Sequence, residues 1–340
     1  MSSNNMIINN IKGKTFILII PNDFMIYEVF ELNLRKIGFD LLSIVPKDFR
    51  YKNYGLRIIN FIYKNVKKNS NYKSKLVREF RSEDIINKIN HLGENEIDYV
   101  LILRPDIINI ETIQKLLTIG KKVVAYQWDG LNRYPEVLDC IALFEKFLVF
   151  DEQDFNQYKP KFSNLQRCDN FFFDYDDGSE NNRSSKKVFY VGSYIEDRID
   201  DLQLTLNELE KCGVDFDINL KYHRSTKPFN DSRIQFFKTN LPYKDNINRL
   251  KDSKIILDFK VKEHSGLSLR FFEALKYEKK IITNNVSVLK YNFYDSQNIF
   301  ILHHDDIDGL QKFIDLKYKK LPTEIVDQYS FSSWLNKYVV

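Results

Sequence analysis

The chain has 340 residues, of which 43% are hydrophobic, 14% aromatic and 29% charged, and its formal net charge is +4. This length suggests two domains of ordinary size, and the composition is that of a soluble protein with real hydrophobic cores. No apolar run approaches the length of a membrane span, and the polar start at residues 1–14 lacks the apolar core of a signal peptide. Cys140, Cys168 and Cys212 have neither a pairing motif nor metal-site spacing, so we expect buried thiols in a reducing, cytoplasmic setting.

The first half of the chain alternates strands and helices with short connections. We predict strands at 15–20, 39–45, 97–103, 122–127 and 147–150, and helices at 26–37, 110–119, 134–143 and 152–158. Such alternation predicts a parallel sheet covered by helices on both faces. We assign residues 1–173 to this N-terminal domain.

A strongly basic segment at residues 47–81 interrupts the alternation. It has eleven Lys and Arg residues against Asp48 and Glu79, a net charge of +9, so the rest of the chain carries −5. We expect two helices in this region, at 55–66 and 75–89. The segment either binds an anionic partner, such as a membrane leaflet, a lipid-linked acceptor or a nucleic acid, or is a solvated insertion; the sequence leaves both interpretations open.

Alternation resumes after a polar stretch at 174–187, which we interpret as the interdomain linker. We predict strands at 188–191, 215–220, 255–259, 281–283 and 299–302, and helices at 197–212, 246–251, within 264–275 and at 307–318. Residues 187–320 would form a second domain, and residues 321–340 a terminal helix that packs back across both. The predicted fold is therefore α/β, with two Rossmann-like domains facing each other across a cleft.

Ligands of such sheets bind beyond the carboxyl ends of the strands. In the second half, the residues at these positions are cations, glycines and hydroxyls that suit a nucleotide diphosphate: Gly192, Ser193, Lys260 and His264. In the first half they include carboxylates, among them Asp23 and Asp129, which suit acceptor binding or a general base.

The stretch 264–275 holds the strongest local signal. A strand leads into the loop Gly266-Leu267-Ser268 and then into an amphipathic helix that carries Arg270 and Glu273. A glycine loop before a helix can approach a phosphate closely, and Arg270 adds a planar cation. Taken singly, each feature also has an ordinary explanation, such as a plain turn at Gly192 or a surface ion pair of Glu273.

Four groups of motifs resemble the CgeB-like glycosyltransferases of the GT-B fold, many of which are labelled lipopolysaccharide or capsule biosynthesis proteins. The motifs are residues 266–275 followed by 279–284, residues 292–294 followed by 298–299, residues 126–129 followed by 149–151 and Asp154, and residues 190–193 followed by 196–199. The resemblance implies two Rossmann-like domains, with a nucleotide-sugar donor held mainly by the C-terminal one. It also implies no essential metal and no cofactor beyond the donor, for which we expect a UDP-sugar.

The resemblance also implies roles for single residues. Glu273 would bind the donor ribose, while Arg270 and the loop 266–268 would hold the diphosphate. Gly192, Ser193 and Arg198 would line the diphosphate or acceptor side. Retaining enzymes of the wider fold often have two glutamates eight positions apart here, but this chain has Ser265 at the earlier position. The stereochemistry therefore stays open, and a base for an inverting reaction would be Asp129 or, second, Asp23.

The sequence thus predicts a glycosyltransferase that moves a sugar to a surface glycan, with the basic segment docking an anionic acceptor or the inner membrane face. Lys260 would help to stabilise the leaving diphosphate. One alternative is a non-catalytic nucleotide- or glycan-binding protein of the same fold. A nucleic-acid-binding protein is the weakest alternative, because nothing in the chain matches a nucleic-acid-binding fold.

Overall fold

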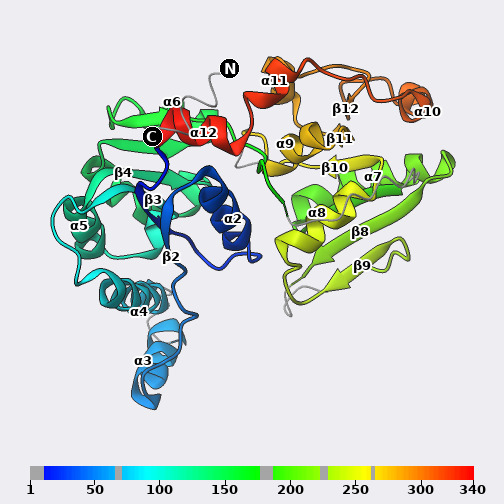
Figure 1. The fold of residues 1–340 in the computed structure, drawn as a ribbon. Helices are drawn as coiled ribbons and strands as arrows, with labels where there is room; N and C mark the ends of the chain where they lie inside the picture. Colours follow the sequence, from blue (N-terminus) through cyan, green and yellow to red (C-terminus); the bar gives the residue numbers. More distant parts are fainter. Residues whose placement is uncertain (1–10, 66–70, 177–186, 223–228, 262–264) are drawn as a thin grey trace.

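The computed structural model describes residues 11–65, 71–176, 187–222, 229–261 and 265–340, and contains two six-stranded parallel sheets. The first has the order β2 (Asp40–Ile44), β1 (Thr15–Ile19), β3 (Ile97–Leu103), β4 (Gly120–Gln127), β5 (Lys146–Val149) and β6 (Leu165–Arg167). The second has the order β12 (Ile299–Ile301), β11 (Lys280–Thr283), β10 (Ile255–Asp258), β7 (Lys187–Ser193), β8 (Asp215–Lys221) and β9 (Ile234–Phe237). Figure 1 shows the two sheets side by side, each with its own helices.

Each sheet has one point where the chain reverses its direction of growth. In the first sheet, β1 pairs with β2 on one side and with β3 on the other; in the second, β7 lies between β8 and β10. Ligands of open α/β sheets bind at such switch points, beyond the strand ends. The topology therefore directs attention to the residues that follow β1, β7 and β10.

Helices cover both faces of each sheet, as the alternation predicts. The N-terminal half has α2 (Tyr27–Ile37), α3 (Tyr54–Asn65), α4 (Asn71–Ile89), α5 (Ile110–Ile119) and α6 (Glu152–Tyr158). The C-terminal half has α7 (Glu196–Lys211), α8 (Tyr243–Lys251), α9 (Leu269–Lys276), α10 (Leu310–Asp315), α11 (Thr323–Asp327) and α12 (Phe331–Tyr338). Strand β3 shows why the apolar runs lie inside: Leu101 and Leu103 face one core, whereas Val100 and Ile102 face the other.

The end of the chain crosses from one half to the other. Residues near α11 pack against the C-terminal sheet, but Phe331 and Trp334 of α12 are buried among Phe30 and Phe171 of the N-terminal half. The crossing is also held by backbone hydrogen bonds between Phe172 and Tyr329 (2.9 Å) and between Phe331 and Phe172 (2.8 Å). The predicted terminal helix that packs back is confirmed.

Several local predictions were wrong. The segment predicted as a helix at 134–143 forms two short 3₁₀ turns, η3 (Pro135–Asp139) and η4 (Ile141–Leu143), and a third, η2 (Leu131–Arg133), precedes it. Strands β6 (Leu165–Arg167) and β9 (Ile234–Phe237) were missed, because each is short and interrupted by one or more polar residues and so lacks the continuous apolar run of the equally short β10 and β12. The helix predicted at 307–318 is only α10, preceded by η6 (Ile307–Gly309).

The α/β fold of two Rossmann-like halves is confirmed, whereas the domain boundaries stay predictions, since most of the linker (177–186) lies outside the described residues. Cys140 and Cys168 are buried free thiols as expected, but Cys212 is only half-buried. No helix in the ranges that the structure covers is long and apolar enough to cross a bilayer.

Candidate functional site

A cavity of about 410 Å³ lies between the two halves, at the carboxyl ends of β1, β7 and β10. Its N-terminal wall includes Asp23, Trp128 and Asp129. Its C-terminal wall carries predicted residues from both strand ends and from α9: Gly192, Ser193, Arg198, Lys260, Gly266, Ser268, Arg270 and Glu273. The structure therefore gathers ten of the twelve predicted site residues around one space. Leu267 instead lies in the core, 1% exposed, and His264 lies outside the described residues.

The first turn of α7 contributes a cation, Arg198, to this cavity. The helix follows β7 directly, and its N-cap residue, Ile195, offers no side-chain hydrogen bond to the first turn. Arg198 lies in that turn and donates a hydrogen bond to the buried Tyr190 hydroxyl, but its buried Nε has no partner among the described residues. Gly192 is required here for packing, because a Cβ would lie 2.9 Å from the Tyr190 hydroxyl. The first turn of α7 thus brings the Arg198 guanidinium to the cavity, although the same turn also carries the carboxylates of Glu196 and Asp197.

Lys260 adds a second cation from the next strand. It follows β10, and its backbone N–H donates to Asn284 Oδ1 at 2.8 Å, which fixes the loop. Its ammonium group makes no ion pair with any residue in the described ranges. Arg198 and Lys260 thus line the cavity without a carboxylate partner among the described residues, as does Lys221, whose Nζ donates to the neutral amide of Asn240 at 2.6 Å.

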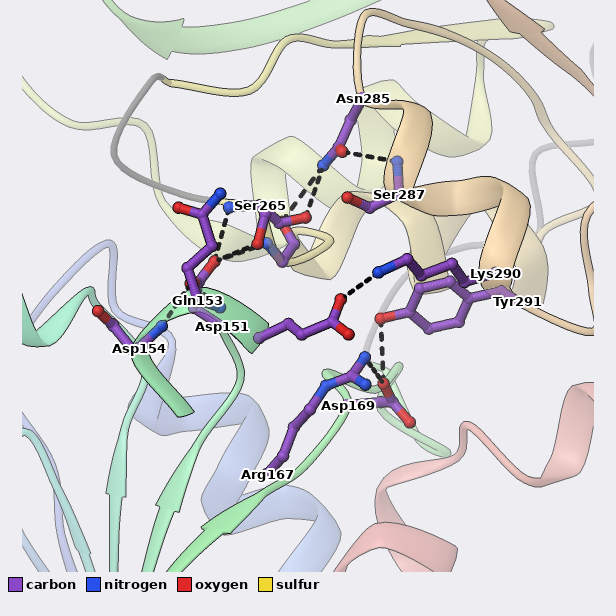
Figure 2. Close-up of polar contacts among 12 residues, drawn as sticks. Asp151, Gln153, Asp154, Arg167, Asp169, Ser265, Asn285, Ser287, Lys290 and Tyr291 are labelled. Atoms are coloured by element: carbon purple, nitrogen blue, oxygen red, sulfur yellow. Dashed lines mark hydrogen bonds and ion pairs between the residues drawn. The ribbon is translucent and has the colours of Figure 1, made fainter. Parts of the chain in front are cut away.

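The loop before α9 differs from its prediction. The N–H groups of Ser265 and Gly266 do not point at an open space but donate to Asp151 Oδ2, at 2.6 and 2.8 Å (Figure 2). Asp151 Oδ1 caps α6 by accepting from Gln153 and Asp154, and the side chain is fully buried. The amides expected to hold a diphosphate thus hold a carboxylate of the other half.

The Asp151 carboxylate is kept ionised by these donors. Burial alone would raise its pKa, but the N–H groups of Asp154, Gly266 and Ser265 hold the pKa below its ordinary value. The first turn of α9 is capped as well, since Ser268 Oγ accepts from the Arg270 N–H. The anion site implied for this loop is therefore filled from within the protein.

Arg270 is likewise paired. Its Nη1 lies 3.0 Å from Oδ2 of Asp258, a carboxylate only 5% exposed, and Ser268 Oγ donates to the same oxygen at 2.7 Å. Arg270 still lines the cavity, but its charge is largely balanced by Asp258. Sequence reasoning missed Asp258, although a carboxylate at the end of the apolar run 255–259 was a visible signal.

Glu273 is buried in the cavity wall, 6% exposed. Burial raises its pKa, and a hydrogen bond with Tyr243 opposes that effect. Tyr243 was not identified from the sequence, because nothing in a half-exposed tyrosine at the start of α8 indicates a partner thirty residues on. A buried carboxylate with one hydroxyl donor can accept further hydrogen bonds from a sugar hydroxyl.

Asp23 stands on a strained loop after β1. Phe24 and Met25, the next two residues, have φ of 56° and 54°, in the left-handed region that such side chains rarely adopt. The Phe24 carbonyl accepts from the Tyr243 N–H at 2.6 Å, which ties the loop to the C-terminal half. Burial raises the pKa of Asp23, and Arg104 opposes the shift. No hydrogen bond fixes its carboxylate to another described residue.

Asp129 has a different environment. Its Oδ2 lies 2.6 Å from Arg104 Nη1, and its Oδ1 lies 3.3 Å from Arg133 Nη1. Arg104 also makes two 2.7 Å bonds to Asp106, and its guanidinium stacks 3.8 Å above the Tyr134 ring. The Asp129 carboxylate is therefore held between two guanidinium groups. Because Asp23 makes no such contacts with described residues, it is the base that we favour below, although the sequence placed Asp129 first; both roles stay predictions.

Gly266 is needed for close packing between the halves. A Cβ at this position would lie 2.5 Å from Phe150 Cδ2 and 3.0 Å from the Phe150 carbonyl oxygen. We expect Gly266→Ala to lower the free energy of unfolding by about 1–3 kcal/mol, measured by urea denaturation. Gly309→Ala is the matched control: its φ is −76° and its Cβ would meet nothing within 4 Å, so stability should not fall. Equal stability of the two variants would contradict this packing role.

Within the described ranges, no three His, Cys, Asp or Glu side chains gather closely enough to hold a metal ion. His303 and His304, adjacent in sequence, each contact a separate carboxylate on the surface, Asp201 and Asp305. The site is therefore built from cations and carboxylates rather than from a cluster of metal-ligating side chains.

The chain matches no protein-family model, and no curated protein resembles it significantly in sequence. Its fold is similar to those of solved glycosyltransferases. A UDP-forming α,α-trehalose-phosphate synthase from Burkholderia xenovorans has a TM-score of 0.56 at 10% identity, over 96% of this chain and 98% of that one. Anabaena Alr3699/HepE, solved with UDP and glucose, has a TM-score of 0.53 at 7% identity, over 96% of this chain and 98% of that one. TarM has a TM-score of 0.50 at 13% identity, and the match covers 76% of this chain and 57% of TarM. The two-domain fold is thus that of the GT-B class.

Proposed function

We propose that the protein is a glycosyltransferase that uses a nucleotide-sugar donor. The observation that carries the proposal is the interdomain cavity, in which Arg198 and Lys260 carry charge that no described residue balances, opposite the carboxylate of Asp23. A volume of about 410 Å³ suits a ligand of this size. The GT-B fold, shared with HepE, which was solved with UDP and glucose, supports the same substrate class.

In the proposed complex, the diphosphate lies at the N-terminus of α7, between Arg198 and Lys260. As the bond from the sugar to the diphosphate breaks, negative charge grows on the leaving group and these cations stabilise it. They would thereby do what a divalent cation does in other transferases. Glu273 accepts hydrogen bonds from the ribose, and we propose a UDP-sugar as donor.

Asp23 is the proposed general base. Its raised pKa brings it closer to the pH at which a base works best, and its carboxylate is held by no hydrogen bond to a described residue. It would remove the proton from an acceptor hydroxyl as that oxygen attacks the sugar, in an inverting reaction. We propose a surface glycan as acceptor, supported by the motif resemblance to lipopolysaccharide and capsule enzymes.

The donor is tested by thermal shift with UDP, CDP, GDP and their sugars, followed by an assay for nucleoside diphosphate release. Stabilisation by one nucleotide series, with release when an acceptor glycan is added, supports the proposal. Binding without release on any acceptor would instead favour a non-catalytic protein of the same fold.

Arg198→Ala should weaken UDP binding about ten- to a hundredfold, since a charge-assisted hydrogen bond contributes about 1.5–3 kcal/mol. Calorimetric titration measures the affinity. Lys211→Ala, at the exposed far end of the same helix, is the matched control and should leave affinity unchanged. A melting temperature within the range of the control shows that the fold is intact. Unchanged affinity in Arg198→Ala would remove Arg198 from the diphosphate site.

A further inference from the structure

Helix α3 exposes an apolar face to solvent. Ile58 is 60% exposed, Phe61 65% and Ile62 43%, and Tyr54 and Ile59 continue the face at 81% and 40%. At 100° per residue these five side chains occupy one side of the helix, as an amphipathic helix requires. The chain exposes few large apolar side chains, and a third of those described lie on this one helix.

The opposite face of α3 accounts for how the helix is held. Asn60 Nδ2 donates to the Tyr51 hydroxyl at 2.9 Å, and Tyr63 stacks on Tyr72 of α4 at 4.5 Å. Leu56 lies on this inner side and is half-buried. The exposed face is therefore a fixed surface and not the frayed side of a mobile helix.

Exposed cations occur on α3 and on the segments on either side of it. Arg50, Arg57 and Lys73 are exposed and make no ion pair with any residue in the described ranges. The whole segment 47–81 carries +9. Apolar side chains flanked by cations on a short helix are the features of a helix that lies in the plane of an anionic membrane surface.

We propose that α3 docks on the surface of an anionic lipid bilayer. A second copy of the chain is a poor occupant, because a symmetric contact would bring two +9 segments together. A nucleic acid would use the cations but would leave the apolar face in water. A bilayer accommodates both, since the apolar face enters the acyl boundary while the cations meet lipid phosphates.

The placement fits a lipid-anchored acceptor for the proposed function. Figure 1 shows α3 at the tip of the N-terminal half, below α4 and away from both sheets. At the other end of the segment, Arg81 of α4 is close enough to Asp23 for each charge to affect the other's pKa. The segment thus extends from the cavity rim to the docking face, although the docking itself requires no transfer reaction.

The test is co-sedimentation of the full chain with vesicles of phosphatidylglycerol and phosphatidylcholine, and with vesicles of phosphatidylcholine alone. The wild type should bind the mixed vesicles and bind the neutral ones at least tenfold more weakly. Ile58→Asn with Ile62→Asn should lower binding to mixed vesicles at least tenfold, as should Arg57→Glu with Lys73→Glu. Added salt should weaken the wild-type binding.

Matched controls change the same chemistry elsewhere. Val286→Asn with Leu289→Asn removes exposed apolar side chains from η5 (Val286–Lys290), and Lys312→Glu with Lys317→Glu reverses two exposed charges; both should bind like the wild type. The proposal would be overturned if the α3 variants bound vesicles as well as the wild type does. It would also be overturned if the wild type did not bind the mixed vesicles. A dimer, seen by light scattering, that only Ile58→Asn with Ile62→Asn dissociates would overturn it as well. The vesicle test uses no donor or acceptor. A failure of membrane docking therefore leaves the transferase proposal untouched, and a failure of the transferase proposal leaves membrane docking untouched.

Discussion

Replacing Asp23 with Asn should lower the turnover of sugar transfer by about 10²–10⁴-fold while leaving the affinity for the nucleotide unchanged. The amide keeps the size of the side chain and its place beside the cavity, but it cannot take a proton from an acceptor hydroxyl. The affinity should hold because the proposed nucleotide contacts, Arg198 and Lys260, come from the other half. Steady-state kinetics and calorimetric titration measure the two quantities separately.

The pH dependence provides an independent readout. Burial raises the pKa of Asp23 above its ordinary value of 3.8, so the base form is lost on acidification earlier than for an exposed Asp. The acid limb of the wild-type kcat/KM profile should therefore lie above pH 3.8 and be absent from the residual activity of Asp23→Asn.

Stability should change in the opposite direction to activity. A carboxyl whose folded pKa is raised stabilises the fold fully below its unfolded pKa, and this contribution is lost as the pH rises through the folded pKa. At neutral pH, Asp23→Asn should accordingly be at least as stable as the wild type in urea. A variant that is less stable than the wild type and has normal turnover would contradict both the destabilising effect of the buried Asp23 charge and the catalytic role of Asp23.

Asp129→Asn is the matched control for the assignment of the base. Asp129 faces the same cavity but is held by Arg104 and Arg133. Asp129→Asn should lower turnover less than Asp23→Asn does. It should also leave the acid limb of the kcat/KM profile in place. A larger loss at Asp129 would restore the order expected from sequence, with Asp129 as the base.

The sequence predicted where the site lies better than how it works. Residues after β1, β7 and β10 do meet around one cavity, because parallel strands bring their carboxyl ends to one edge. The local pattern around Gly266 predicts N–H groups free to bind an anion. It cannot reveal that Asp151, more than a hundred residues earlier, already accepts from them.

The same reason explains the other differences. Pairings of Arg270 with Asp258, and of Glu273 with Tyr243, depend on which side chains the completed fold brings together. Long periodic elements such as α5 and β3 were predicted to the residue, whereas β6 and β9, held mainly by pairing with a neighbouring strand, have no signal of their own. Only the consequences of local sequence could be predicted from one chain.

The contact between the two halves therefore helps to build the site, because it fixes the loop before α9. Asp151 reaches the loop 265–266, Glu152 pairs with Lys290 at 2.5 Å, and the Tyr291 hydroxyl donates to Asp169 at 3.0 Å (Figure 2). Glu152 and Lys290 are partly exposed and contribute little to stability. Asp151 is buried, so most of the polar stabilisation of this contact should depend on it.

Asp151→Ala should lower the free energy of unfolding by about 3–5 kcal/mol. The change leaves the N–H groups of Ser265 and Gly266 without an acceptor at a buried contact and removes the cap of α6, and each buried donor left unpaired costs about 1–3 kcal/mol. Because the folded pKa is lowered, the stabilisation is present above pH 3.8 and is lost as the pH falls through the folded pKa. Urea denaturation at neutral and at acid pH should show a gap between variant and wild type that narrows on acidification.

Asp306→Ala separates the interdomain role from ordinary capping. Asp306 caps η6 by accepting from the Asp308 N–H at 3.2 Å, and this contact stays within one surface turn. Loss of this cap should lower the free energy of unfolding by no more than about 1 kcal/mol. If Asp151→Ala were no more destabilising than Asp306→Ala, the carboxylate would act only as a helix cap. The amide of Gly266 would then be open to the diphosphate, as the sequence suggests for the loop 266–268.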